Sequence, residues 1–107
     1  MDPSAKVRLF YRQDQVLAVF SGALAIANAR RLFAPVARTN AAHLIMDFSA
    51  VTEVDSAAVV ELVRLVPRRR VSIVSPAGTQ PRKFFETMHV VDFVPTYDTA
   101  SDALRSR

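Results

Sequence analysis

The stretch that decides the fold is residues 43–63, HLIMDFSAVTEVDSAAVVELV. It opens with a compact apolar run, HLIMDFSAV, which is typical of a strand buried on both faces of a sheet. Asp55 and Ser56 follow, and both are residue types that cap the N-termini of helices. From there apolar residues recur at helical spacing. The stretch therefore predicts a central strand joined to a helix whose core-facing stripe is Ala58, Val59, Leu62, Leu65 and Val66.

Two further elements are predicted on the N-terminal side of this stretch. Residues 6–21 contain two short apolar runs around a polar turn at Gln13 and Asp14, which indicates an antiparallel hairpin. Residues 24–37 have the spacing of an amphipathic helix. Its predicted apolar face is Ile26, Ala29, Leu32, Phe33 and Val36, and its polar face carries Asn28, Arg30 and Arg31.

On the C-terminal side, a strand and another helix are predicted. Residues 70–76, RVSIVSP, form a β-branched run that ends at a proline. The strand–helix–strand order then predicts a parallel connection to the central strand. Residues 78–90 predict a helix with Thr79 or Gln80 as its cap.

The remaining residues complete an α/β pattern. VDFVP, at residues 91–95, is interpreted as a short strand or an extended tail, and a final helix is predicted with Asp98 or Thr99 as its cap. No repeat, linker or low-complexity tract interrupts the chain. We expect a single α/β domain over residues 1–107, with a mixed sheet of about four to five strands and helices packed on it.

The composition excludes several classes of site. The chain has 107 residues, two glycines and no cysteine, which rules out glycine-rich phosphate loops, disulfides, thiolate catalysis and cysteine-based metal sites. Its two histidines, His43 and His89, lack metal-ligand spacing, and structural roles explain both. We therefore expect no enzymatic activity, no metal and no cofactor.

Neither a membrane span nor a signal peptide is predicted. No apolar run approaches the roughly 20 residues that cross a bilayer. The first ten residues, MDPSAKVRLF, lack the charged region and apolar block of a signal peptide. The sequence predicts a cytoplasmic location, either as a soluble protein or as the cytoplasmic domain of a membrane protein.

One cluster dominates the charge pattern. The formal net charge is +4, and VPRRRV at residues 66–71 places three arginines together. We interpret this run as a solvated turn. As an outside alternative, Arg68, Arg69 and Arg70 would contact an anion, a nucleic acid or a membrane surface. Nucleic acid ranks last as a partner, because no aromatic residues interleave the arginines and no recognisable reading helix carries the others.

The helix after Asp55 has a second apolar flank. Val60 and Val63 follow Ser56 on the same side of the helix. An apolar flank beside a hydroxyl at the start of a helix is typical of a docking surface for another protein. A phosphate on Ser56 would be favoured by the N-terminal amides and opposed by the Asp55 carboxylate. The alternative is that Asp55 or Ser56 serves only as the helix cap.

Residues 43–63 resemble the central strand, loop and helix of STAS domains. This module is shared by bacterial anti-sigma-factor antagonists and the cytoplasmic tails of SulP-type anion transporters. In that family an apolar strand ending in Asp-Leu-Ser leads to Asp-Ser-Ser-Gly, or a close variant, at the start of a helix; here DFS and DSAA occupy these places. PRKFFETMHVVDFVPTYDTASDAL, at residues 81–104, is similar to the closing segment of the family. The resemblance implies helices packed on a mixed sheet.

The resemblance also implies a regulatory role. Ser56 matches the position that a partner kinase phosphorylates in anti-sigma-factor antagonists, and Asp55 matches the acid before it. The implied partner is an anti-sigma factor that doubles as the kinase, and phosphate ends its binding. The partner-binding face would consist of Asp55, Ser56, Ala57, Val60 and Val63.

A second role implied by the resemblance is that of a C-terminal regulatory domain of a SulP-type sulfate or anion transporter. The partner would then be the membrane part of the transporter. SGALAIANA, at residues 21–29, has Ala23 and Ala25 where antagonists have two acids, and it is similar to the GPLFFANA type of segment in those transporters. Ala57 and Ala58 stand where many members of the family have Ser-Gly.

Overall fold

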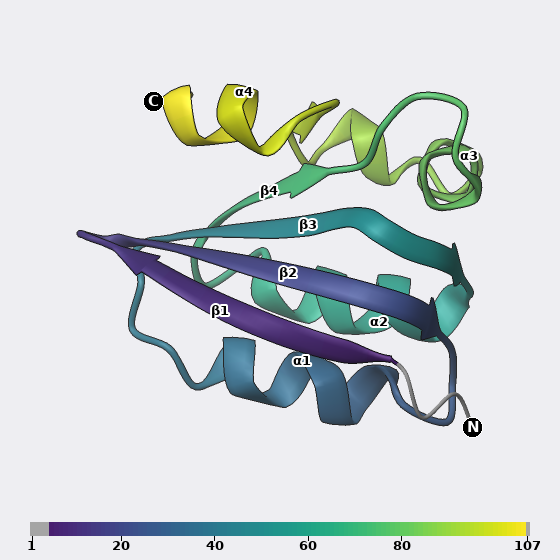
Figure 1. Ribbon diagram of the computed structural model, residues 1–107, viewed down its shortest axis with the longest axis horizontal. Coiled ribbons are helices and arrows are strands. Elements are labelled where there is room, and N and C mark those ends of the chain that lie inside the picture. The colour runs from purple at the N-terminus through teal and green to yellow at the C-terminus, as the bar shows by residue number, and fades with distance from the viewer. Residues whose placement is uncertain (1–4, 107) are drawn as a thin grey trace.

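The structure is a computed structural model that describes residues 5–106, and its centre is a five-stranded sheet. The strands are β1 (Lys6–Arg12), β2 (Gln15–Leu24), β3 (His43–Val54), β4 (Arg70–Val74) and β5 (Thr96–Tyr97). They lie in the sheet in chain order, with β1 antiparallel to β2 and the other neighbouring pairs parallel (Figure 1). The predicted mixed sheet is therefore confirmed.

Helices cover both faces of this sheet. The described residues form α1 (Ala29–Ala37), α2 (Ser56–Leu65), α3 (Gln80–Thr87), the short 3-10 helix η1 (Val90–Asp92) and α4 (Ala100–Arg105). Most buried side chains of α1, α2 and α3 belong to the main core on one face, whereas α4 packs on the opposite face. In Figure 1, α1 and α2 lie next to each other along the sheet and start at the same end of the molecule.

Four phenylalanine rings form the centre of the main core. Phe20 of β2 stacks on Phe33 of α1 with 4.8 Å between ring centroids, and on Phe48 of β3 with 5.3 Å. Phe85 of α3 meets Phe48 edge-on at 5.1 Å. Buried aromatic pairs of this kind stabilise a core beyond the effect of their area alone. These contacts fix α1 and α3 against the two strands whose ends carry the candidate site.

β3 is buried on both faces over its first half, as the apolar run predicts. Leu44 belongs to the main core, whereas Ile45 packs with Ala103 of α4 on the other face. α4 keeps its position with the help of Thr99, whose Oγ1 accepts a hydrogen bond from the Asp102 N–H at 3.2 Å. Of the two caps predicted for this helix, Thr99 is the one observed.

The N-terminal helix differs from its prediction at two residues. Ile26 was expected on the apolar face, but α1 begins only at Ala29 and the Ile26 side chain is 86% exposed. Asn28 was expected on the polar face, but it is 3% exposed. The reason is a turn before the helix, in which the Ala25 carbonyl accepts from the N–H of Asn28 at 3.0 Å and of Ala29 at 2.8 Å.

VDFVP was interpreted as a short strand or an extended tail, but its first two residues are helical. Val90–Asp92 form η1, and β5 begins only at Thr96. His89, in the left-handed conformation with φ 61°, turns the chain from the end of α3 into η1. The Pro95 carbonyl then accepts from the Ile73 N–H at 2.9 Å, which starts the pairing of β5 with β4.

Candidate functional site

Asp55 is the N-cap of α2. Its Oδ1 accepts a hydrogen bond from the Ala57 N–H at 2.9 Å, the bond expected of a capping carboxylate. Its Oδ2 accepts from the Ile26 N–H at 3.3 Å, and its own N–H donates to the Leu24 carbonyl at 3.3 Å. Asp55 therefore joins the start of α2 to the loop that follows β2.

Ser56 is the first residue of α2, and its side chain is exposed. Because Asp55 supplies the cap, the Ser56 hydroxyl has no hydrogen-bond partner within residues 5–106. The N-terminal amides of a helix favour a negative group at this position. The hydroxyl is therefore available to another molecule.

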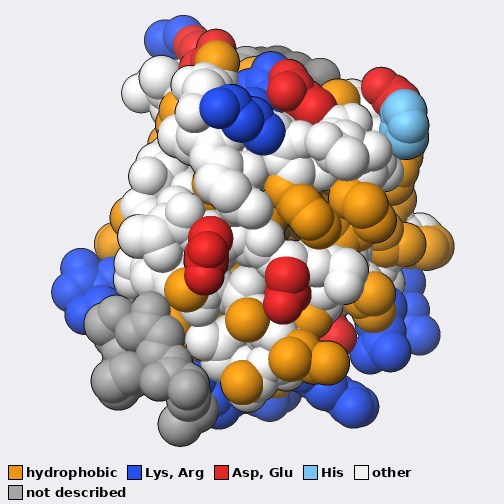
Figure 2. Space-filling model, turned by 90° about the vertical axis from the view of Figure 1, so that its right-hand side faces the viewer, with side chains coloured by type: hydrophobic (Ala, Val, Ile, Leu, Met, Phe, Trp, Pro, Cys, Tyr) orange, Lys and Arg blue, Asp and Glu red, His pale blue; other side chains and the backbone are white. Residues whose placement is uncertain are grey.

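A hollow of about 460 Å³ lies between the starts of α1 and α2, and we call it the Ser56 hollow. Two exposed aliphatic side chains line it. Ile26 comes from the loop before α1, and Val60, whose side chain is 48% exposed, comes from the second turn of α2. Figure 2 looks onto this end of the molecule, where hydrophobic side chains spread over the lower half and Lys and Arg side chains lie along the lower edge. The other lining residues are Ala29, Arg30, Asp55, Ser56, Ala57 and Glu61.

The structure brings four of the five predicted face residues together. Asp55, Ser56, Ala57 and Val60 all line the Ser56 hollow. Val63 is exposed but lies further along α2, outside this lining. Sequence reasoning missed the contribution of the loop before α1, because it placed that segment inside the helix.

Two amide side chains hold the walls of the Ser56 hollow in place. Asn28 accepts from the Ala25 N–H at 2.9 Å and donates to the Ala23 carbonyl at 3.0 Å, which shapes the loop carrying the exposed aliphatic residue. Gln80 accepts from the Val54 N–H at 2.8 Å and donates to the Val54 carbonyl at 3.1 Å, just before the α2 cap. Neither role was predicted, although an Asn in a turn is a known signal of such bonding.

Anti-sigma factor antagonists are among the solved structures with a similar arrangement of strands and helices. No protein-family model matches the sequence, and no curated protein matches it. An anti-sigma factor antagonist from Mycobacterium paratuberculosis has a TM-score of 0.80 at 21% identity, over 96% of this chain and 94% of its own. The anti-sigma factor antagonist SpoIIAA, in its unphosphorylated form, has a TM-score of 0.74 at 17% identity, over 92% of each chain. This chain has the STAS fold.

The basic run of this STAS fold does not form one surface. Arg69 donates to the Ala37 carbonyl at 3.0 Å and, with Arg68, lines a groove between α1 and α2. Arg70 is instead the first residue of β4 and lines a different hollow, next to His43. The fold therefore separates the three arginines that the sequence analysis grouped as one anion or membrane contact.

His43 has a structural place in the STAS fold. The Gln15 amide nitrogen lies 3.2 Å from its Nδ1, and the Ser72 Oγ lies 2.8 Å from its Nε2. Since the amide can only donate, the neutral imidazole carries its proton on Nε2 and donates it to Ser72. Burial, followed by the charge of Arg70, lowers the pKa of His43 below the usual 6.5, while Asp14 acts in the opposite direction.

The rest of the described chain offers few other candidates for chemistry. Within residues 5–106, no group of three or more His, Asp or Glu side chains is placed to hold a metal ion. His89 is exposed and lies 3.1 Å from the Asp92 carboxylate. No helix of this part of the chain is long and apolar enough to cross a membrane.

Proposed function

We propose that this chain is a non-enzymatic STAS regulatory module of the anti-sigma-factor-antagonist type, which binds a protein partner at the Ser56 hollow. The observation that carries the proposal is that the unpartnered Ser56 hydroxyl lines the same hollow as two exposed aliphatic side chains, Ile26 and Val60. Apolar side chains at a concave surface gain free energy when a partner removes them from water. The contact face would consist of Asp55, Ser56, Ala57, Val60 and Val63, with Ile26 added from the structure.

Phosphorylation of Ser56 would act on this face as a switch. The Ser56 hollow contains the carboxylates of Asp55 and Glu61 and the guanidinium of Arg30. A phosphate would add a charge of about −1.5 to −2 to this set. A partner that covered the hollow would have to desolvate that charge, which is costly unless the partner supplies new cations. Phosphorylation is therefore expected to weaken binding of a partner selected for the unmodified hydroxyl.

Among the roles considered, the antagonist role has the most support. Both compared antagonists match this chain over more than 90% of each length. A regulatory domain of an anion transporter would have the same fold and would present the same face to the membrane part. The basic nucleic-acid or membrane binder has less support, because Arg68 and Arg69 line one hollow and Arg70 lines another.

The proposed contact is tested with one substitution inside the hollow and one outside it. The probes are the anti-sigma factors encoded in the same genome, titrated by calorimetry. Val60→Asp places a charge in the hollow and is expected to weaken the tightest interaction at least about tenfold. Phe93→Asp changes a residue that is 53% exposed, follows η1 and lies outside the hollow, so its affinity should equal that of the unaltered chain. Equal affinities for all three chains would refute the contact.

A further inference from the structure

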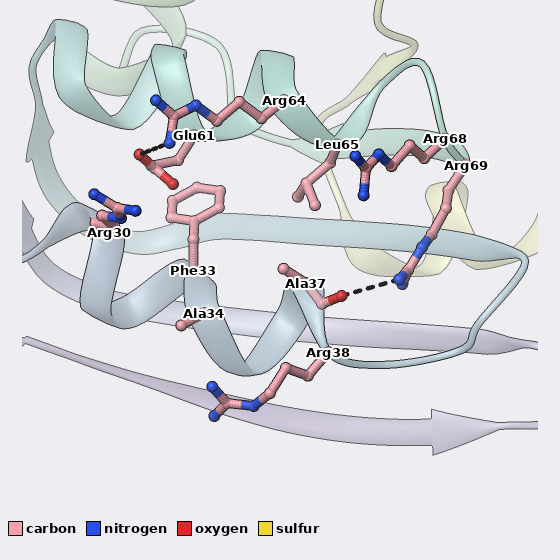
Figure 3. Close-up of a pocket in the computed structure, with 10 residues that line it drawn as sticks. All are labelled: Arg30, Phe33, Ala34, Ala37, Arg38, Glu61, Arg64, Leu65, Arg68 and Arg69. Atoms are coloured by element: carbon pink, nitrogen blue, oxygen red, sulfur yellow. Dashed lines mark hydrogen bonds and ion pairs between the residues drawn. The ribbon is translucent and has the colours of Figure 1, made fainter.

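A second concave surface lies between α1 and α2, beyond the Ser56 hollow, and we call it the arginine groove (Figure 3). Its volume is about 500 Å³, which lies within the range of sites for small ligands. Both helices and the turn after α2 line it. Its charged lining consists of five arginines and one acid: Arg30, Arg38, Arg64, Arg68, Arg69 and Glu61.

Two of the five arginines have partners in the protein. Arg64 pairs with Glu61 at 3.5 Å, and this contact neutralises the single acid of the groove. Arg69 donates to the Ala37 carbonyl and to the Thr39 Oγ1, each at 3.0 Å. A guanidinium has five N–H groups, so these two bonds hold Arg69 in position and leave donors for a ligand.

The other three arginines are uncompensated. The guanidinium groups of Arg30, Arg38 and Arg68 form no hydrogen bond or ion pair with any residue of the described chain. Five positive charges against one negative charge leave an excess of four around the groove. Like charges held around a small concave surface raise the local potential and attract anions.

The floor of the groove is apolar but exposes little surface. In Figure 3 the side chains of Phe33, Ala34 and Leu65 lie between the arginines. Phe33 and Leu65 are nearly fully buried, so they offer little surface to a ligand. Recognition in this groove would therefore depend on charge and guanidinium hydrogen bonds, with a minor apolar contribution.

We propose that the arginine groove binds a small ligand with two adjacent phosphate groups, either free diphosphate or a diphosphate carried on a small apolar body. Guanidinium forks match the geometry of phosphate oxygens and bind them with paired, charge-assisted hydrogen bonds. A diphosphate concentrates several negative charges within the size of this groove. The site differs from the arginine run of the sequence, because it takes Arg68 and Arg69, adds residues of α1, and excludes Arg70.

The shape of the groove favours a small anion over a surface. A bilayer is flat on the scale of one protein, so its phosphates cannot all enter a hollow of this size together. The Ser56 hollow shares Arg30 and Glu61 with the groove. For this reason Arg30 is kept unchanged in the test, which uses Arg38 and Arg68.

The test is calorimetric titration of the full chain with inorganic pyrophosphate, compared with sulfate at equal ionic strength. We expect one saturable site for pyrophosphate and at least about tenfold weaker binding of sulfate. Arg38→Ser and Arg68→Ser should each raise the Kd for pyrophosphate about tenfold. Arg12→Ser removes the same charge from an exposed position outside the groove and should leave the Kd unchanged. Thermal melting of each variant checks that it is folded.

Two further titrations determine what carries the diphosphate and whether the arginine groove binds independently of the Ser56 hollow. Tighter binding of dimethylallyl diphosphate than of pyrophosphate would assign an apolar body to the ligand, and equal binding would assign free diphosphate. Ser56→Ala, which adds no charge beside the shared Arg30, should bind pyrophosphate as well as the unaltered chain does, so that a failure of the proposed docking face leaves this site intact. The proposal is overturned by absent or unsaturable binding, by equal losses in Arg12→Ser and Arg68→Ser, or by binding only to phosphatidylserine-containing vesicles.

Discussion

At the scale of single residues, Asp55 does more than cap a helix. One carboxylate oxygen accepts from the Ala57 N–H, whereas the other accepts from the Ile26 N–H in a different element. The cap was predictable, because it depends on residues adjacent in the sequence. The second bond was not, because it depends on where the loop after β2 returns. Asp55 therefore couples the stability of α2 to the shape of the Ser56 hollow.

Removing the Asp55 carboxylate should destabilise the fold measurably. Asp55→Ala loses the cap and the bond to the loop, and we expect a loss of about 1–2 kcal/mol in the free energy of unfolding. Asp55→Asn keeps an acceptor oxygen and should lose less than half of that amount. Ser56→Ala, which removes a hydroxyl without a protein partner, should change stability by no more than about 0.5 kcal/mol. Urea denaturation of the three variants measures these differences, and an equal loss in all three would contradict the roles assigned.

For His43, the sequence indicated the kind of role but not the partners. Its lack of metal-ligand spacing favoured a structural role, and in the structure its ring lies within hydrogen-bond distance of Gln15 and Ser72. The sequence did not predict that His43 would be buried beside α4 between Gln15 and Ser72, because neither partner is near it in the sequence. The neutral imidazole fits this site, whereas a protonated ring would direct a second N–H at the Gln15 amide donor.

The lowered pKa of His43 predicts a pH dependence of stability. The unfolded chain, in which the histidine has a pKa near 6.5, takes up the proton more readily than the folded protein does. The contribution of His43 is therefore complete above about pH 6.5 and is lost as the pH falls toward the folded pKa. Urea denaturation between about pH 7.5 and pH 5.5 should show a decline that is smaller in His43→Gln. Identical slopes for both chains would show that His43 is not the group responsible.

At the scale of elements, the buried side-chain amide of Asn28 determines the conformation of the loop between β2 and α1. Apolar spacing alone extended the predicted helix back to residue 24, because the periodicity of apolar residues does not reveal a turn. The Asn28 side chain forms hydrogen bonds with the backbone of Ala23 and Ala25 in the loop, and α1 begins at the next residue, Ala29. The exposed position of Ile26 follows from this turn, and with it one wall of the Ser56 hollow.

Loss of the Asn28 amide should therefore affect both stability and the loop. Asn28→Ala removes two side-chain hydrogen bonds from a buried position, and we expect a loss of about 1–3 kcal/mol. Asn40→Ala, at an exposed position without a hydrogen bond to the described residues, is the matched control and should be neutral. Hydrogen exchange should become faster at the Ala25 amide in the first variant only. Unchanged exchange there would mean that the turn does not depend on Asn28.

At the scale of the whole molecule, the predictable and unpredictable parts separate by distance along the chain. The central strand, α2 and their junction were predictable, because burial on both faces and helical spacing are local patterns in residues 43–63. Ser56 and Val60 were paired correctly for the same reason, since they lie on one helix. Ile26 and Gln80 are far from residues 43–63 in the sequence, and they reach the site only because the fold packs β2 and α3 against β3. No local sequence pattern predicts such contacts.

The same argument applies to the arginines. Three consecutive arginines suggested one surface, but consecutive residues at the start of a strand point to opposite faces of the sheet. Arg69 therefore reaches α1, whereas Arg70 lies beside α4, where it donates to the Ser106 hydroxyl at 3.4 Å. Only two of the five arginines of the resulting groove, Arg68 and Arg69, belong to that run, and the others come from α1, the residue after it and α2.

The most direct test of the regulatory account is to map phosphate after the chain is incubated with ATP and each anti-sigma-factor kinase encoded in the same genome. Mass spectrometry should place a single phosphate on Ser56 with at least one kinase, Ser56→Ala should remain unmodified, and the modified chain should bind that kinase more weakly. Modification at other residues only, or none with any kinase, would contradict the account.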